Sequence, residues 1–414
     1  MKYLAFVFLV LYIYSVTFAI FLTDFIRVPA PIMFGLPLVF IFKNEWPKLL
    51  YGKEIVLFSL AVFLYYYVGL SDSKEFFTNA IKIGMCALFF SYFVGNNRQR
   101  FTLAIFTFYA LLTFSAVLMV LNTVNPEKIN AIRTMLLGEQ VMQSPSGIAV
   151  YQFTFGYQLA ALVPFLFIFT FAFKKPLIVK AASLIICLIF IYLGMQRSVL
   201  IGFTLTVFLF LWCYYNYRSV FIVAVTVFAA VMLYTYVLKD NFDTYNNIIT
   251  KNERNSAEYN RSALTAENLR IYAEYPYGLI FYGKTWGDVI YRNEVFSSGI
   301  TSHNAYLMFF TYLGPFLGIG LLIGLYYKIA KIAIATLRNV RKKENAMMIC
   351  LCCSFFAVSI NSLSHNSWLV NANGPTLFLY FSILHLHYLL QSKEEPEYKS
   401  MPDGIPSIKE TAIY

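Results

Sequence analysis

The stretch that decides the fold runs from residue 176 to residue 216 and reads PLIVKAASLIICLIFIYLGMQRSVLIGFTLTVFLFLWCYYN. It contains two apolar runs of about 20 residues each, the length that a helix needs to cross the hydrocarbon of a bilayer. Only the polar pair Gln196 and Arg197 interrupts them. The stretch therefore predicts two membrane-spanning helices, over 176–195 and 198–216, joined by a tight turn.

Runs of this kind recur along the whole chain, separated by short polar connectors. The predicted spans are 2–22, 30–42, 54–71, 79–95, 101–121, 153–173, 176–195, 198–216, 219–238, 304–327, 346–363 and 371–390. The second is short and contains Pro31 and Pro37, which favours a kinked or re-entrant segment. The first lacks a small-residue cleavage site and is interpreted as a retained helix. We predict an all-α polytopic membrane protein with about twelve transmembrane helices.

The composition argues against a soluble enzyme built around a hydrophobic core. Of the 414 residues, 59% are hydrophobic and only 13% are charged, whereas a soluble domain carries about 25% charged residues. No repeat or separate soluble domain breaks the pattern. The sequence predicts a single transmembrane domain over 1–390, with a large loop at 239–303, and a flexible cytoplasmic tail over 391–414.

Lysine and arginine are concentrated in alternate connectors. One side has Lys2, Lys43, Lys48, Lys53, Arg98, Arg100, Lys174, Lys175, Arg218, Lys328, Lys331, Arg338, Arg341, Lys342, Lys343, Lys393, Lys399 and Lys409. The short connectors of the other side have Arg27, Lys74, Lys128, Arg133 and Arg197. By the positive-inside rule both termini are cytoplasmic and the 239–303 loop is periplasmic.

The net charge of +11 is explained by this arrangement, because cytoplasmic lysines and arginines face anionic lipid headgroups. A nucleic-acid partner would require basic and aromatic residues on a soluble face, and we expect none. The six cysteines all fall inside predicted spans, so neither a disulfide framework nor a cysteine metal site is expected.

The periplasmic loop is predicted to be partly helical. Residues Arg261 to Tyr275 have apolar side chains at helical spacing, and Pro276 and Gly278 then end the helix. The loop returns to the membrane through Ser302, His303 and Asn304 at the start of the tenth span.

His303 is the first candidate for chemistry, because an imidazole takes up a proton near neutral pH. The alternative is an interfacial histidine at a helix end that Ser302 caps. Arg197 could bind an anion with its forked guanidinium, or extend to water from the membrane edge. Arg261 and Arg270 could form an anion cradle, or lie on the solvated face of the loop helix. His365 is a secondary candidate.

His365 lies in a Ser-His-Asn triplet at 364–366 that repeats the triplet at 302–304 on the same predicted side of the membrane. A three-residue match can also arise by chance, and both interpretations stay open. Asp240, Asp243, Asp288 and Glu294 do not form a metal-binding cluster by their spacing, so we expect a reaction without a metal ion.

Three short motifs follow one another along the second half of the chain. The outer turn reads Gln196-Arg197-Ser198. In the loop, Arg261 stands 17 residues before Gly278, with a proline between them. The tenth span opens with His-Asn-Ala-Tyr-Leu at 303–307, followed by two spaced glycines, Gly314 and Gly318.

In order, spacing and predicted side of the membrane, these motifs resemble those of the O-antigen polymerase and ligase superfamily. The resemblance covers residues 190–390, and the N-terminal half matches only in topology. Gln196 stands where relatives carry serine or threonine, which loosens one of the three correspondences.

The resemblance implies a glycosyltransferase of the bacterial inner membrane with its active site facing the periplasm. The donor would be an oligosaccharide on undecaprenyl diphosphate, with no cofactor. His303 would be the general base, Asn304 would orient the ring or a sugar, and Arg197, Arg261 and Arg270 would bind the pyrophosphate. Membrane lipid is an expected partner, and the resemblance leaves open a protein that regulates chain length.

Within the superfamily we favour a polymerase, which transfers the growing chain onto the next lipid-linked repeat unit. The alternative is a ligase that transfers the finished chain to lipid A-core. A transporter or flippase is the alternative of another class, and it would place charged residues at the bilayer midplane. The charged or imidazole residues within the spans all lie near predicted ends: Glu54, Lys82, Lys180, His385 and His387. A purely structural subunit is a further possibility.

Overall fold

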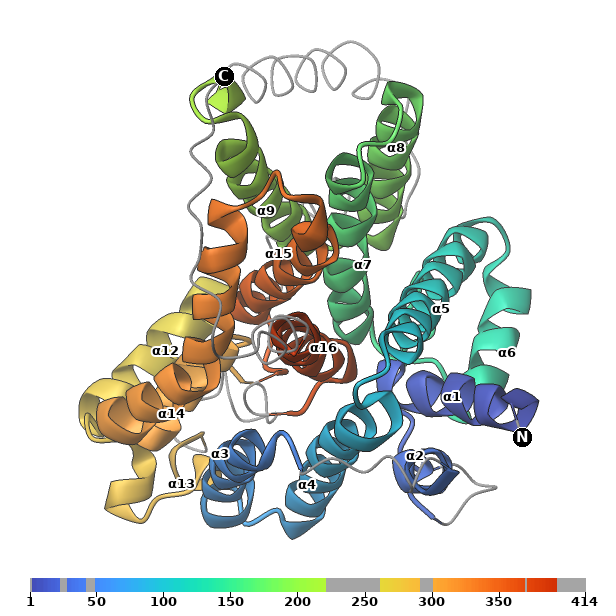
Figure 1. The fold of residues 1–414 in the computed structure, drawn as a ribbon. Coiled ribbons are helices and arrows are strands. Elements are labelled where there is room, and N and C mark those ends of the chain that lie inside the picture. Colours follow the sequence, from blue (N-terminus) through green and yellow to red (C-terminus); the bar gives the residue numbers. More distant parts are fainter. Residues whose placement is uncertain are drawn as a thin grey trace, which may run out of the picture.

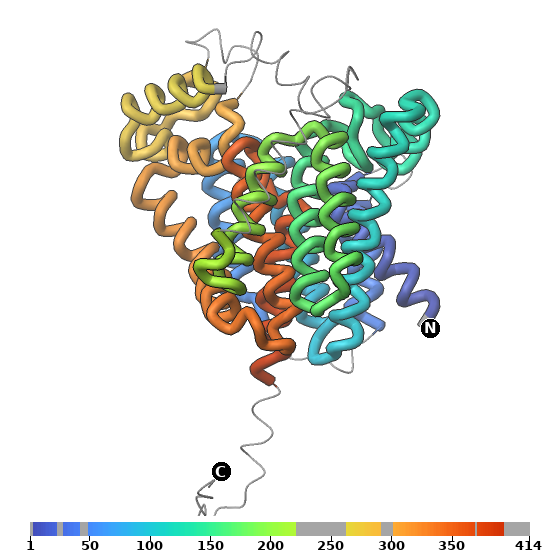
Figure 2. The backbone as a smooth tube through the Cα atoms, turned by 90° about the horizontal axis from the view of Figure 1, so that it is seen from above, coloured from blue at the N-terminus to red at the C-terminus, as the bar shows by residue number. Residues whose placement is uncertain are grey.

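The computed structural model of the chain describes residues 2–22, 28–41, 49–220, 261–290, 301–368 and 371–392. These residues form helices and turns, and no strand occurs among them. Figure 2 shows most helices running side by side, with α12 (Arg261–Glu274) at one end of the bundle and the last turn of α16 (Gly374–Gln391) at the other. We call these the α12 end and the opposite end.

Eight helices of the described residues are long and apolar enough to cross a membrane. They are α3 with its π-helical continuation (Gly52–Gly69), α4 with its continuation (Ser73–Val94), α5 (Arg98–Val124), α7 (Gln152–Ala172), α8 (Leu177–Gly194), α9 (Arg197–Tyr215), α14 (Ala305–Arg338) and α15 with its flanking turns (Lys343–Ser364). The chain therefore has the helices of a multi-pass membrane protein.

The prediction of about twelve spans is met only in part. Two further apolar helices, α1 (Lys2–Thr17) and α2 (Ala30–Ile41), are shorter, and α2 contains Pro37. The span predicted over 219–238 lies outside the described residues apart from its first two. The last predicted span, 371–390, is helical as α16, but α16 is not among the eight helices that are long and apolar enough to cross a membrane.

Local capping explains where the structure differs from the predicted boundaries. Helix α4 begins at Ser73 rather than at residue 79, because the side chain of Asp72 accepts a hydrogen bond from the amide of Glu75. The connector after α5 forms an unpredicted helix, α6 (Pro126–Leu137). Asn125 caps it and Gly138 ends it in the left-handed conformation, both of which are ordinary helix-boundary signals.

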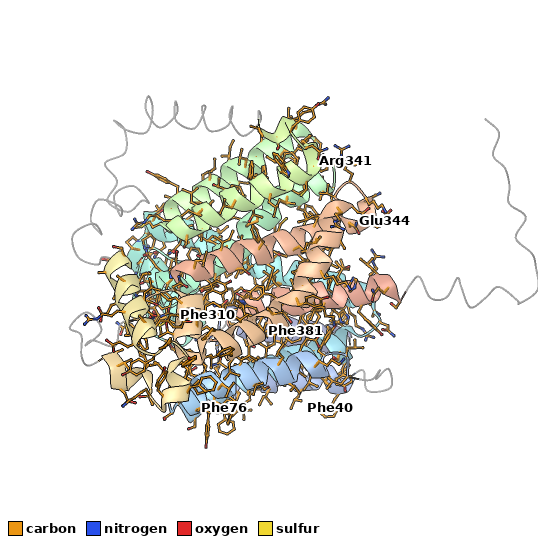
Figure 3. All side chains as sticks on the ribbon, turned by 90° about the vertical axis from the view of Figure 1, so that its left-hand side faces the viewer. Phe40, Phe76, Phe310, Arg341, Glu344 and Phe381 are labelled. Carbon is orange, nitrogen blue, oxygen red and sulfur yellow. The ribbon has the colours of Figure 1, made fainter. Side chains whose placement is uncertain are left out.

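Helices α7 and α15 are the most buried of the spanning helices and lie near the middle of the bundle in Figure 1. Helix α9 packs closely on α15 at Gly202, where an added Cβ would lie 3.1 Å from the carbonyl oxygen of Ala357. Aromatic rings fill the space between helices, as in the stacked pair Phe108 and Phe378. In Figure 3, Phe310 and Phe381 lie within the bundle, whereas Arg341 and Glu344 lie at the opposite end.

Helix α14 is interrupted at Gly314, whose φ of 73° lies outside the helical region. The chain after α12 presses directly on this break. A Cβ on Gly314 would lie 1.8 Å from the carbonyl oxygen of Tyr277, and one on Gly278 would lie 2.3 Å from the amide nitrogen of Gly314. Two glycines thus let one backbone rest on another, and this contact fixes α12 relative to α14.

We expect Gly314→Ala to lower the free energy of unfolding by at least about 2 kcal/mol, because the new methyl group meets backbone at a left-handed φ. Gly320→Ala is the matched control in the same helix, since nothing lies within 4 Å of a Cβ there. Thermal unfolding of the two purified variants in detergent measures the difference. Equal melting temperatures would show that the backbone contact is unimportant.

Candidate functional site

Arg197 is held out from the bundle by the residues on either side of it. Gln196 and Ser198 are 4% and 7% exposed, whereas Arg197 is exposed. Met195, two residues before Arg197, has a φ of 55°, so the chain reverses sharply between α8 and α9. The predicted tight turn is therefore present, with its arginine side chain accessible.

Two hydrogen-bonded braces hold this turn. On one side, Nε2 of Gln196 donates to the carbonyl oxygen of Gln152 at 2.9 Å. On the other, Oγ of Ser198 donates to Oδ1 of Asn361 at 2.7 Å and lies 3.4 Å from Nε2 of His365. Because Gln196 is longer than serine or threonine, its amide can reach across to the start of α7.

His303 lies at the edge of a groove of about 480 Å³ at the α12 end. The groove is lined by Ser262, Thr265, Ala266, Leu269, Ser302, His303, Leu363 and Ser364. Its walls thus combine four hydroxyl groups and one imidazole with aliphatic side chains. Such a surface can hydrogen-bond a polar neutral group while its apolar parts contact carbon atoms.

The residues flanking His303 have structural roles. His303 itself has a φ of 52°, an uncommon conformation that histidine adopts more readily than most residues. Asn304 caps α14, since its Oδ1 accepts a hydrogen bond from the amide of Leu307 at 3.0 Å. The cap is therefore Asn304 and not Ser302, which corrects that part of the sequence interpretation.

The two Ser-His-Asn triplets are neighbours in space. The carbonyl oxygen of His365 accepts a hydrogen bond from the amide of Ala305 at 2.9 Å. The side chain of Asn366 also bonds to that of Thr301. The imidazole of His365 is only 4% exposed and lies about 6 Å from the rings of Phe153 and Tyr157. His365 is thus a buried support that joins the start of α14 to the Arg197 turn.

Helix α12 forms one wall of the groove with Ser262, Thr265, Ala266 and Leu269. It is anchored by Asn268, which is 0% exposed. Nδ2 of Asn268 donates to Oγ of Ser302 at 3.2 Å, and its Oδ1 accepts a hydrogen bond from Thr311. Asn268 was not singled out from the sequence, although it shares one helix face with Leu264 and Ile271 at helical spacing.

The two arginines of α12 have different positions. Arg261 is the first residue of the helix, and its side chain lies outside the described residues. The side chain of Arg270 is 71% exposed and lies 4.0 Å from the carboxylates of Glu267 and Glu274 on its own helix. Such surface pairs contribute little to stability, and Arg270 is not among the residues that line the groove.

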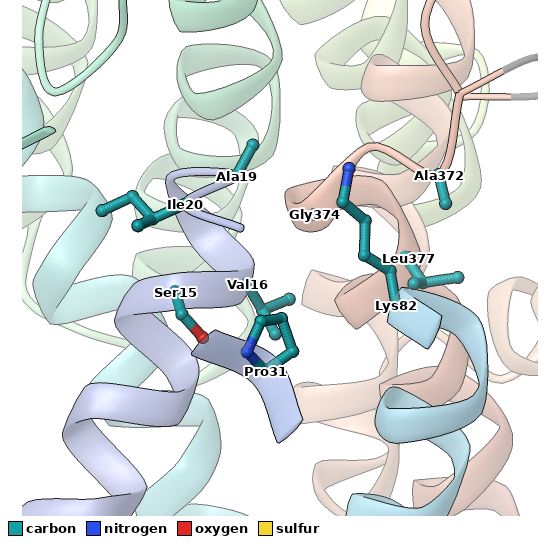
Figure 4. Close-up of a pocket in the computed structure, with 9 residues that line it drawn as sticks. All are labelled: Ser15, Val16, Ala19, Ile20, Pro31, Lys82, Ala372, Gly374 and Leu377. Carbon is teal, nitrogen blue, oxygen red and sulfur yellow. The ribbon is translucent and has the colours of Figure 1, made fainter. Parts of the chain in front are cut away.

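Lys82 is one of the residues that line a second, smaller cavity. It lies in the third turn of α4, and so further from the start of its helix than the sequence predicted. In Figure 4 its amino group lies beside Gly374 and Ala372 at the start of α16. Among the described residues no carboxylate lies within 4.0 Å of it. The cavity measures about 10 Å³, which is room for a single water molecule. It is too small for a sugar or a diphosphate.

Within the described ranges, no group of three or more His, Cys, Asp or Glu side chains is arranged to hold a metal ion. No protein-family model matches the chain, and no curated protein matches it significantly. The candidate site therefore rests on its geometry, with His303 and Arg197 connected through the buried pair Ser198 and His365.

We expect Asn268→Ala to loosen α12, because it leaves Ser302 and Thr311 without a hydrogen-bond partner on that helix, at a cost of about 1–3 kcal/mol. Hydrogen exchange of the α12 amides should accelerate in this variant. Glu274→Ala, which changes an exposed residue of the same helix, is the control and should leave exchange unchanged. Equal exchange in both variants would contradict the anchoring role of Asn268.

Proposed function

We propose that the protein is a membrane glycosyltransferase, an O-antigen polymerase that works at the periplasmic face of the bacterial inner membrane. It transfers a growing glycan from undecaprenyl diphosphate to a hydroxyl group of the next lipid-linked repeat unit. The observation that carries the proposal is the pairing, at one end of the bundle, of a hydroxyl-lined groove beside His303 with an exposed arginine on a doubly braced turn.

The reaction needs a base and a site for the leaving group. In the proposed step, an imidazole nitrogen of His303 removes the proton of the acceptor hydroxyl, and the oxygen attacks the anomeric carbon of the donor sugar. The bond between that carbon and the diphosphate oxygen breaks, and undecaprenyl diphosphate leaves with the electron pair. Arg197 and Arg261 stabilise the negative charge that develops on the diphosphate.

We give the other site residues different roles in this proposal. Asn304 supports the proposal indirectly, because its cap fixes the first turn of α14 next to His303. His365 is assigned to positioning, since it is buried and bonded to Ser198. Arg270 has local ion-pair partners and is the weakest candidate for the diphosphate.

Deletion of the gene in its host tests the activity, with the surface polysaccharide resolved on a lipopolysaccharide gel. We expect lipid A-core that carries a single repeat unit, because ligation continues while polymerisation stops. Bare core, with polymer accumulating on the lipid carrier, would identify a ligase instead. An unchanged ladder would exclude O-antigen assembly and turn attention to capsule synthesis or transport.

His303→Ala should lower the transfer rate by a factor of about 10² to 10⁴, the usual contribution of a general base. His387→Ala is the matched control, because His387 is a half-buried histidine near the end of α16, a helix that contributes no residue to the lining of the groove. The rate is measured as polymer formed by membranes that contain equal amounts of each folded variant. Wild-type transfer by the His303 variant would disprove its role as base.

A further inference from the structure

Arg133 is an arginine that the proposed reaction does not use, and it is completely buried. It lies on α6 with 0% of its surface exposed, although the sequence counts it among the few basic residues of the outer connectors. The neighbouring apolar side chains of α6 point the other way, since Met135 is 76% exposed and Ile132 is 40% exposed. Arg133 is therefore not present in order to give α6 a polar surface toward water.

Among the residues that the structure describes, the guanidinium of Arg133 binds neutral acceptors only. Nε donates to the carbonyl oxygen of Gly147 at 2.7 Å, and Nη2 donates to that of Ala149 at 3.0 Å. Nη1 donates to Oδ1 of Asn130 at 2.7 Å. Longer or additional bonds reach the carbonyl oxygen of Gln143, the side chain of Asn122 and the hydroxyl of Ser146.

Burial lowers the pKa of Arg133 to about 10, so the side chain remains charged at neutral pH. A buried charge is tolerated only if its donors are satisfied, and a guanidinium has five of them in a fixed plane. The carbonyl groups of loop 143–149 satisfy Nε and Nη2, and the side chain of Asn130 satisfies Nη1. The loop between α6 and α7 is therefore folded around one side chain.

The same loop is tied to the start of α7. The amide of Gln152 donates to Oε1 of Gln143 at 3.0 Å, and Nε2 of Gln152 donates to the carbonyl oxygen of Pro145 at 3.0 Å. The carbonyl oxygen of Gln152 in turn accepts the hydrogen bond from Gln196. A short, continuous series of hydrogen bonds thus leads from Arg133 to the residue before Arg197.

We propose that Arg133 is a positioning residue that sets the location of Arg197 through loop 143–149 and the Gln152–Gln196 bond. The hydrogen bonds of Gln196 and Ser198 hold the turn that carries Arg197, so they determine the place from which its exposed side chain extends. A guanidinium that must meet a diphosphate gains from being fixed in place before the ligand arrives. That last use of Arg197 rests on the proposed function, whereas the mechanical link to Arg133 does not.

The test uses the full-length protein in lipid nanodiscs and three variants. Arg133→Lys keeps a positive charge but removes the planar fork that bonds several carbonyl groups at once. Gln196→Met cuts only the last link and leaves the loop intact. Tyr14→Phe is the matched control, since it removes a 2.6 Å hydrogen bond from Tyr14 to the carbonyl oxygen of Leu136 on the same helix, away from the proposed route.

Hydrogen exchange followed by mass spectrometry reads out the link directly. In Arg133→Lys we expect the amides of 143–152 and of 194–200 to exchange about tenfold faster, as loss of hydrogen bonds to a charged group predicts. In Gln196→Met only 194–200 should change, and in Tyr14→Phe neither segment should change. Faster exchange of 143–152 with unchanged 194–200 in Arg133→Lys would overturn the proposal. If Arg133→Lys does not fold, unchanged 194–200 in Gln196→Met would also overturn it.

Transfer kinetics with lipid-linked repeat units extracted from the host separate the two proposals. Poor positioning of Arg197 should lower kcat/KM for the donor about tenfold in Arg133→Lys and Gln196→Met, because the proposed role of Arg197 is to stabilise the charge that develops on the diphosphate. The variants are compared at equal amounts of folded protein, so a general loss of folded protein does not produce this change. If exchange changes as expected while kcat/KM does not, the link from Arg133 stands and the diphosphate role of Arg197 is wrong.

Discussion

The rest of the structure depends on one constraint, which is that buried polar side chains must find hydrogen-bond partners where little water is present. A polar side chain placed among apolar helices must find its hydrogen-bond partners within the protein, because lipid offers none. Arg133, Asn268 and Ser198 all obey this rule, with their polar atoms bonded to loops or to neighbouring helices. Asn268 and Ser198 join segments that lie far apart in the chain, whereas Arg133 joins α6 to the loop that follows it. Polar residues thereby determine how the helices and the loops at the α12 end are placed relative to one another.

Backbone contacts add a second kind of constraint at the same end. Gly278 rests on Gly314, where α14 is interrupted, and no larger residue would allow the two chains to approach so closely. The cap provided by Asn304 and the buried carbonyl of His365 then fix the first turn of α14. These contacts connect the elements on both sides of the groove beside His303.

The candidate site combines a fixed framework with accessible reactive groups. Arg197 is exposed, yet the residues before and after it are buried and hydrogen-bonded. His303 lies at the edge of an open groove, while its counterpart His365 is enclosed by aromatic rings. His303 thus lines a groove that is open to a ligand, whereas His365 is buried inside the protein.

The sequence by itself determined the helical class, most of the spanning segments, the helix over α12 and the polar turn at Arg197, because all of these depend on local runs of apolar residues and on breaker residues. Only the tertiary structure showed that Arg133 and Asn268 are buried, and that Ala305 and Thr301, on either side of the first Ser-His-Asn triplet, bond to the second. Hydropathy assigns a charged residue to a connector but cannot tell whether the chain folds back over it. For Asn268 that outcome depends on partners more than 30 residues away, and for Arg133 on how the loop that follows α6 folds back over it, which the hydropathy pattern does not encode.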